Sequence, residues 1–318
     1  MFTRRFFLNL YGMKTFNTKI RHFRTLSEMT QAFNLPKPQH PLICLLDYKD
    51  IMSTTEMLST HFVTDFYSIY YNKKEGCSTS YGQTSYDFME GGLSFISPGQ
   101  PIMCLHSVDS VEGFALFIHP DFLRQYPLDA KMKNYGFFSY SVTESLRLSE
   151  KEKHIIQTLV SIIDDELKTS IDDLSQDVLV AQLELILNYS QRFYKRQFLT
   201  RKLINNDLLN QLNSLLSQYF NDDMILANGL PSVQYLADNL NVSPRYLGDM
   251  LRFYTGQNTQ QHIHDKLIEK AKEKLSASSS TVSEIAYELG FEHPQSFSKL
   301  FKNKTNKSPL EFRASFNN

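Results

Sequence analysis

The sequence has no tryptophan, only three cysteines and no long apolar run. Cys44, Cys77 and Cys104 lie far apart and form no Cys-x-x-Cys pair, so neither a thiol redox centre nor a zinc knuckle is indicated. Separate thiols of this kind are typical of small buried side chains in a reducing cytosol. No apolar stretch approaches the roughly 20 residues that a membrane helix needs. These absences predict a cytoplasmic protein with no membrane partner.

Residues 1–30 form a poorly defined N-terminal segment. Arg4-Arg5 and the apolar residues after them loosely resemble a signal peptide. The apolar stretch is short and broken by Asn9, and no small-residue cleavage site follows it. A cytoplasmic location is still predicted, and a start of translation at either Met1 or Met13 agrees with it.

The chain has almost no net charge, but its charged residues are unevenly distributed. The net charge is −1 over the whole chain. Residues 229–318 carry 11 Lys and Arg against 9 Asp and Glu, whereas the remainder carries 22 against 25. The stretch 293–313 has five basic residues and Glu311 as its one acidic residue. A basic cluster of this kind is compatible with nucleic-acid binding, although net charge alone does not establish it.

The first half of the chain predicts a β domain at 31–148. Short apolar or aromatic segments separated by Gly, Pro, Asn and Asp favour strands, at 41–46, 66–71, 93–96 and 113–118. Several short strands at this spacing are typical of a small antiparallel barrel or sandwich.

Helices are predicted after the β domain. Ser149-x-x-Glu152 is a capping box before an apolar pattern of helical period, and a second amphipathic segment covers about 176–198. The two segments would pair within 149–200, either packed in their own chain or as a dimer interface. A connecting helix and a linker are expected in 201–228.

Residues 232–263 and 281–313 are two copies of one pattern. With an offset of 49, Leu236-Ala237-x-x-Leu240-x-Val242 aligns with Ile285-Ala286-x-x-Leu289-x-Phe291. After one extra residue in the second turn, an offset of 50 aligns Leu247, Leu251, Thr255 and Gly256 with Phe297, Phe301, Thr305 and Asn306.

Each copy has the features of a helix-turn-helix unit. Ser232 and Ser283 are expected to cap a first short helix, and Ser243-Pro244 to begin the second helix of the first copy. The second helices end at Gly256 and Asn306, the residue types that tolerate a left-handed helix end. A helix over about 264–276 would join the copies. Two recognition helices on such a rod can enter successive major grooves, ~34 Å apart.

These residues resemble the DNA-binding domain of the AraC/XylS family, and the similarity covers 229–313. Its most specific part extends from Ile285-Ala-x-x-Leu-Gly-Phe291 through Phe297-Ser-x-x-Phe-Lys302 to Ser308-Pro309-x-x-Phe-Arg313. The resemblance implies an α+β chain that ends in an all-α domain of two helix-turn-helix units, residues 229–318. It also implies a sequence-specific regulator, usually an activator, with an N-terminal sensing or dimerising domain.

The resemblance also implies which side chains contact double-stranded DNA. In the first unit the base-facing positions would be Arg245, Gly248 and Asp249, with Tyr246 and Arg252 near the DNA backbone. In the second unit Pro294, Gln295, Ser298 and Lys299 would face the groove, with His293, Ser296 and Lys302 close by. Arg245 and Lys299 suit guanine, and Gln295 suits adenine. The side chains that suit phosphates are Lys302, Lys304 and Arg252.

The first unit departs from the family at two positions. Members often carry a longer polar or basic side chain where this chain has Gly248 and Asp249. Glycine makes no side-chain contact, and a carboxylate repels phosphate and accepts only from cytosine N4. The first unit is therefore expected to read few bases, and Asp249 is also compatible with a solvated charge on the helix face.

The segment Gly92-x5-Pro98-Gly99 resembles the second barrel motif of cupins, which implies a cupin-like β-barrel. Metal-binding cupins have a histidine where this chain has Met103, and an H-x-H pair that the strand region lacks, so no metal or other cofactor is expected. The barrel would instead bind a small apolar or sugar-like effector. The candidate lining residues, which are equally compatible with a plain core, are Phe66, Tyr70, Phe95, Met103 and Phe117.

Together these features predict a non-enzymatic regulator that acts as a homodimer. The family resemblance further implies RNA polymerase as a partner. The alternative is an effector-independent DNA-binding protein whose N-terminal domain only dimerises. An enzyme of the cupin or alkyl-transfer repair type would need metal-binding histidines or an activated cysteine. The three cysteines have no adjacent basic residue to lower a thiol pKa.

Overall fold

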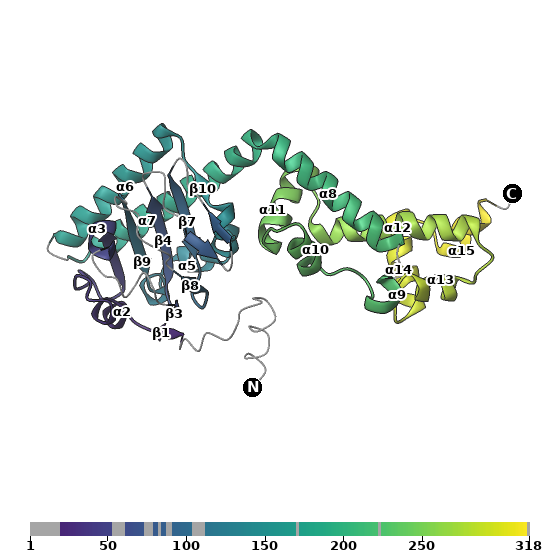
Figure 1. Ribbon diagram of the computed structural model, residues 1–318, viewed down its shortest axis with the longest axis horizontal. Helices are drawn as coiled ribbons and strands as arrows, with labels where there is room; N and C mark the ends of the chain where they lie inside the picture. Colours follow the sequence, from purple (N-terminus) through teal and green to yellow (C-terminus); the bar gives the residue numbers. More distant parts are fainter. Residues whose placement is uncertain are drawn as a thin grey trace. The chain divides into compact units, whose positions relative to one another are not determined.

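The computed structural model describes residues 20–52, 61–72, 79–81, 84–86, 91–103, 112–169, 172–221 and 224–316. Cys77, Cys104 and the residues before Ile20 lie outside this part. The chain divides into two compact units, residues 1–197 and 198–318. The first unit combines sheets with helices, and the described residues of the second unit form helices and loops (Figure 1).

A five-stranded antiparallel sheet forms the centre of the first unit. Its strands, in spatial order, are β10 (Leu146–Arg147), β7 (Gly92–Ile96), β4 (Tyr67–Asn72), β9 (Gly113–Ile118) and β2 (Ile43–Asp47). The central strand β4 places Ile69 opposite Phe95 on one side and Leu116 on the other. Gly113 has no side chain because a Cβ there would lie 1.9 Å from the carbonyl oxygen of Tyr71.

Two smaller sheets accompany it. One joins β1 (Arg21–Phe23), β3 (His61–Thr64) and β8 (Pro101–Met103), with β1 parallel to β3. The other pairs β5 (Thr79–Tyr81) with β6 (Thr84–Tyr86). The described strands form open sheets rather than a closed barrel, so the α+β class is confirmed and the cupin-like barrel is not.

Alternate residues of the five-stranded sheet enter two separate cores. Ile69, Tyr71 and Leu116 face α6 (Glu150–Lys168) and α7 (Ser175–Thr200), which lie along one side of the sheet (Figure 1). Ala115 and Phe117 face the opposite core, with the three-stranded sheet, α2 (Leu26–Ala32) and α3 (Tyr48–Met52). The remaining short elements are α5 (Pro127–Met132), η1 (Pro120–Phe122), η2 (Gly136–Ser139) and η3 (Val142–Glu144). The period-2 alternation of apolar residues therefore serves both faces.

The helices α6 and α7 are held together by a charged contact. The predicted capping box at the start of α6 is confirmed, with Ser149 and Glu152 bonding reciprocally. The Glu152 carboxylate also accepts from the Arg196 guanidinium at 2.8 and 2.9 Å. Bidentate geometry of this kind fixes direction as well as distance.

The second unit begins with the last residues of α7, followed by α8 (Lys202–Asn221). After α8 comes α9 (Met224–Asn228), a short helix where the sequence predicts a linker. The remaining helices are α10 (Val233–Asn239), α11 (Pro244–Thr255), α12 (Thr259–Ala277), α13 (Val282–Glu288), α14 (Pro294–Thr305) and α15 (Pro309–Ala314). None of the helices in the described residues is long and apolar enough to cross a membrane.

Candidate nucleic-acid interface

The two predicted repeats fold into matching units, α10–α11 and α13–α14. Asn241 and Gly290 end the first helix of each unit with φ of 55° and 78°. Gly256 and Asn306 end the second helix with φ of 74° and 59°. Positive φ is costly for most residues and tolerated by Gly and Asn. Sequence and backbone geometry therefore agree at both equivalent positions.

The helix caps confirm one half of the prediction and correct the other. Ser232 and Ser243 cap α10 and α11 through their side chains. Ser283 does not cap α13, because Thr281 occupies the N-cap and forms a capping box with Glu284. Thr281 is also the residue that the offset of 49 places opposite Ser232, so the repeat itself carries the correct assignment.

The apolar positions of both repeats are interior. Leu236, Leu247 and Leu251 of the first unit are fully buried, as are Ile285, Phe297 and Phe301 of the second. The Phe297 ring lies 5.7 Å from that of Phe301 and 5.5 Å from that of Phe291. These side chains hold each second helix against its first, which fixes the direction of its outer face.

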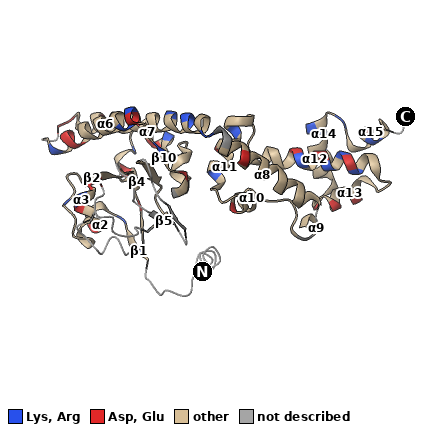
Figure 2. Ribbon diagram, turned by 45° about the horizontal axis from the view of Figure 1, so that its top comes forward, with Lys and Arg blue, Asp and Glu red and all other residues tan. Residues whose placement is uncertain are grey.

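The outer face of α14 is polar and accessible. Gln295, Lys299 and Lys302 are exposed and share one side of the helix, because they are four and three residues apart. Ser296 and His293 are exposed near the start of α14, whereas Pro294 and Ser298 are half-buried. Figure 2 shows Lys and Arg on α14, and a mixture of basic and acidic residues on α11 and α12. The predicted residues of the second unit are thus brought together, with one exception.

That exception is Lys304, which the sequence assigns to phosphate contact. Its ammonium donates to Asp265 Oδ1 of α12 at 2.7 Å. Burial raises the pKa of Asp265, but hydrogen bonds from Lys304 and Gln257 and the charge of Lys304 outweigh that effect and leave the pKa below its usual value. Lys304 is therefore engaged within its own domain.

The outer face of α11 carries an ion-pair ladder. Asp249 lies between two arginines, 3.1 Å from Arg245 Nε and 3.5 Å from Arg252 Nη1. The Asp249 side chain is 22% exposed and the arginine side chains 46% and 58%. The carboxylate thus offsets part of the positive charge that the two guanidinium groups would present to DNA.

Two predicted contacts of the first unit face the protein. Tyr246 is 5% exposed, and its ring lies 5.5 Å from that of Phe198 at the end of α7. A Cβ at Gly248 would lie 3.7 Å from Thr259 Oγ1, so this side of α11 approaches the start of α12. The structure therefore moves Tyr246 from the predicted DNA backbone contact into the core.

Sequence reasoning missed the contacts around Phe198. The Phe198 ring also lies 5.6 Å from that of Phe253, and its carbonyl oxygen accepts from the hydroxyl of Tyr254 and from Asn205 Nδ2. These partners lie up to 56 residues away in sequence, so no local pattern reveals them.

Comparison with known proteins agrees with this geometry. A helix-turn-helix domain model matches residues 236–315. The HTH-type transcriptional activator RhaS of Salmonella schwarzengrund (strain CVM19633) is 30% identical over 135 residues, which is 42% of this chain and 46% of that protein. The chain thus spans about half the length of this relative. Residues 236–315 form an AraC-type helix-turn-helix domain.

Two solved structures are similar to about a third of the chain. An AraC-type transcriptional regulator from Chromobacterium violaceum shares 24% identity and a TM-score of 0.30, over 35% of this chain and 93% of that one. The DNA-binding domain of AdpA, solved with a target DNA, shares 23% identity and a TM-score of 0.28, over 33% of this chain and 91% of that one.

Outside the AraC-type domain, the predicted effector residues do not line one cavity. Phe66 and Tyr70 lie in one core with Phe117, at ring distances of 5.8 and 5.9 Å from it. Phe95 faces the opposite core, 4.4 Å from the Phe137 ring. Met103 lies in β8 opposite His61. The reason is strand parity, because Phe95 pairs with Ile69 and so faces α6 and α7.

A different cavity opens at the edge of the five-stranded sheet. Its volume is about 560 Å³, and it is bordered by residues of β2, β9, α3 and α6. Tyr71 and Phe114 stack at 5.2 Å on its wall, and the Tyr71 hydroxyl accepts from Gln157 Nε2 at 3.3 Å. Burial, with the charge of Glu150, raises the pKa of Tyr71 to about 12. The hydroxyl therefore stays protonated at neutral pH.

The described thiol is Cys44, and His119 lies after β9. Cys44 is buried, and burial raises the pKa of its thiol to about 12. His119 accepts from the Asp121 backbone N–H at 3.2 Å and so caps η1. Within the described ranges, no three His, Cys, Asp or Glu side chains are placed to hold a metal ion.

Proposed function

We propose that this chain is a sequence-specific DNA-binding transcriptional regulator in which α11 and α14 enter successive major grooves. The observation that supports it most is the pair of matched helix-turn-helix units on either side of α12. A helix of 19 residues is about 28 Å long, which is of the same order as the ~34 Å between successive grooves. The exposed polar face of α14 provides the base-reading side chains Gln295 and Lys299.

The second unit of the repeat carries most of the sequence reading. Lys299 suits guanine, Gln295 suits adenine, and Lys302 suits a phosphate. In the first unit Arg245 is the candidate base contact and Arg252 the candidate phosphate contact. Gly248, Tyr246 and Lys304 contribute through packing within the domain.

A role is also proposed for residues 1–197, the compact unit that contains the sheets. This unit senses a small effector and mediates homodimerisation. The protein acts as an activator, the role that the name of the matching relative gives to that relative. A cytoplasmic location and contact with RNA polymerase are part of the same proposal. The cavity beside Tyr71 is the proposed effector site. The alternative is that residues 1–197 only dimerise. A rise in melting temperature with a metabolite mixture, absent when Tyr71 is replaced by leucine, would support the effector.

The proposed function is tested by selecting genomic fragments that the full chain binds at two salt concentrations. The expected result is a short shared sequence whose recovery falls at the higher salt. The control is a variant with Gln295→Ala and Lys299→Ala, which is expected to recover fragments without that sequence. Fragments with no shared sequence for the unmodified protein would contradict sequence-specific regulation.

Replacing Asp249 with asparagine is expected to strengthen DNA binding about five- to tenfold at low salt. The change removes a negative charge from the proposed interface and frees Arg245 and Arg252 to approach phosphates. The salt dependence is expected to steepen by about one released counterion. Titration of one labelled duplex at several salt concentrations measures both quantities.

The matched control for this variant is Asp238→Asn. Asp238 is exposed on α10, where its carboxylate accepts from Gln234 Nε2 of the same helix at 2.8 Å. An equal gain in affinity for both variants would show that only the net charge matters. That result would contradict the proposal that Asp249 weakens DNA binding by pairing with Arg245 and Arg252.

A further inference from the structure

One carboxylate of α12 contacts both the turn that follows α11 and the last turn of α14. Asp265 Oδ2 accepts from Gln257 Nε2 at 2.8 Å, and Gln257 directly follows the C-cap of α11. Asp265 Oδ1 accepts from Lys304 Nζ at 2.7 Å, and Lys304 lies in the last turn of α14. The two oxygens thus hold one residue from each helix-turn-helix unit.

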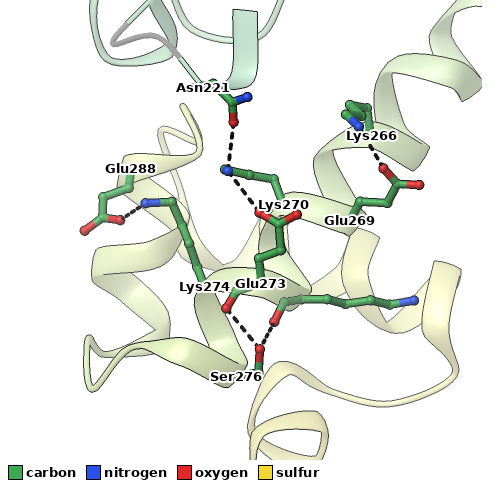
Figure 3. A network of polar contacts seen from close by, with 9 residues as sticks. Asn221, Lys266, Glu269, Lys270, Glu273, Lys274, Ser276 and Glu288 are labelled. Carbon is green, nitrogen blue, oxygen red and sulfur yellow. Dashed lines mark hydrogen bonds and ion pairs between the residues drawn. The ribbon is translucent and has the colours of Figure 1, made fainter. Parts of the chain in front are cut away.

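Other polar contacts of α12 connect to one unit at a time. His262 Nε2 lies 2.9 Å from Thr255 Oγ1 at the end of α11. Lys274 donates to Glu288 of the second unit at 2.6 Å, and Lys270 donates to Asn221 of α8 at 2.9 Å (Figure 3). Among the described side chains of α12, Asp265 is thus the one that hydrogen-bonds both to the turn after α11 and to α14.

The contacts of Asp265 fix the positions of their partners more than they stabilise the fold. The side chains of Lys304 and Asp265 are 27% and 40% exposed, and ion pairs as accessible as this contribute little to the free energy of folding. A charged carboxylate nevertheless directs two donors along its separate oxygens. Loss of the carboxylate would leave the domain folded while releasing the two ends from a common point.

We propose that Asp265 is a positioning residue that sets the separation and rotation of α11 relative to α14, a role that rests on the proposed DNA-binding function. The consequence is a fixed spacing between the two half-sites. One additional base pair rotates the second half-site by about 35°, because B-DNA has 10–10.5 base pairs per turn. If α11 and α14 are held rigidly, the protein should bind DNA with this altered spacing more weakly.

The experiment uses the full chain and the duplex recovered by fragment selection. Versions of this duplex have one base pair removed or inserted between the half-sites, and others keep a single half-site. We expect the unmodified protein to bind the native spacing at least about tenfold more tightly than the altered ones. Asp265→Asn is expected to reduce this preference to about threefold or less, with single half-site affinities unchanged.

Two further variants separate positioning from other effects. Glu269→Gln removes one negative charge from the same helix, where Glu269 pairs with Lys266 at 3.0 Å and is 64% exposed, and it should keep the full spacing preference. Gln257→Leu removes only the contact toward α11 and should also weaken the preference. It carries no change of charge, so its effect does not depend on electrostatic attraction to DNA.

The outcomes distinguish the two proposals. A spacing preference unchanged in Asp265→Asn would overturn the positioning role while leaving DNA recognition intact. A loss of single half-site affinity together with a lower melting temperature would assign Asp265 to folding and also overturn it. No preference for any duplex by the unmodified protein would refute the proposed function itself, and the positioning role with it.

Discussion

Replacing Phe301 with alanine is expected to lower the free energy of unfolding of residues 198–318 by about 3–5 kcal/mol. Phe301 lies on the inner face of α14 and is fully buried. Its ring lies 5.7 Å from that of Phe297 and 5.4 Å from that of Phe312. Removal of the ring leaves a cavity between α14 and α15 that these rigid neighbours cannot fill, so both transfer energy and packing are lost.

Urea denaturation of the full chain, followed by circular dichroism, measures this loss. The helical signal of the second unit should unfold at lower urea, as a separate transition if the two units unfold independently. Leu310→Ala is the control, since Leu310 of α15 is 66% exposed and should change the unfolding free energy by less than about 0.5 kcal/mol. Similar losses in both variants would contradict the placement of Phe301 in the core.

The two helix-turn-helix repeats are largely predictable from the sequence, because the patterns that indicate their helices are local. The apolar period of 3.6 residues placed Leu247, Leu251, Phe297 and Phe301 inward, and all four are buried. Gly256 and Asn306 marked helix ends because their residue types suit positive φ. Such features depend on a few consecutive residues, so a single sequence contains them.

Contacts between distant residues were not predictable in this way. The family resemblance implies a phosphate contact for Lys304, yet its partner Asp265 lies 39 residues earlier in the sequence. Tyr246 follows an exposed arginine, and nothing near it in sequence indicates Phe198. In contrast, the start of α12 at Thr259, before the expected 264, does have a local signal, which is the capping box between Asn258 and Gln261.

In residues 1–197, the positions of the strands are easier to predict than the side of the sheet on which each side chain lies. The segments 41–46, 66–71, 93–96 and 113–118 overlap β2, β4, β7 and β9. Both faces of this sheet are covered, so apolar residues occur at odd and even positions alike. Without the register, Phe95 and Phe117 could not be assigned to opposite cores.

Replacing Lys299 with alanine is expected to weaken binding to the selected operator by about 1–3 kcal/mol, a loss of roughly 5- to 150-fold. Lys299 is exposed on the outer face of α14, on the same side as Gln295. As a proposed base contact, it should affect the cognate sequence far more than a scrambled duplex. Competition titrations with both duplexes measure the affinity and the discrimination between them.

Lys302→Ala is the matched control for this prediction. Lys302 is exposed one turn later on the same face, and its loss changes the net charge equally. As a phosphate contact, it should weaken both duplexes alike and reduce the salt slope by about one. If Lys299→Ala also weakened both duplexes alike, Lys299 would be a phosphate contact. Sequence reading by the second helix-turn-helix unit would then depend on Gln295 and its neighbours at the start of α14.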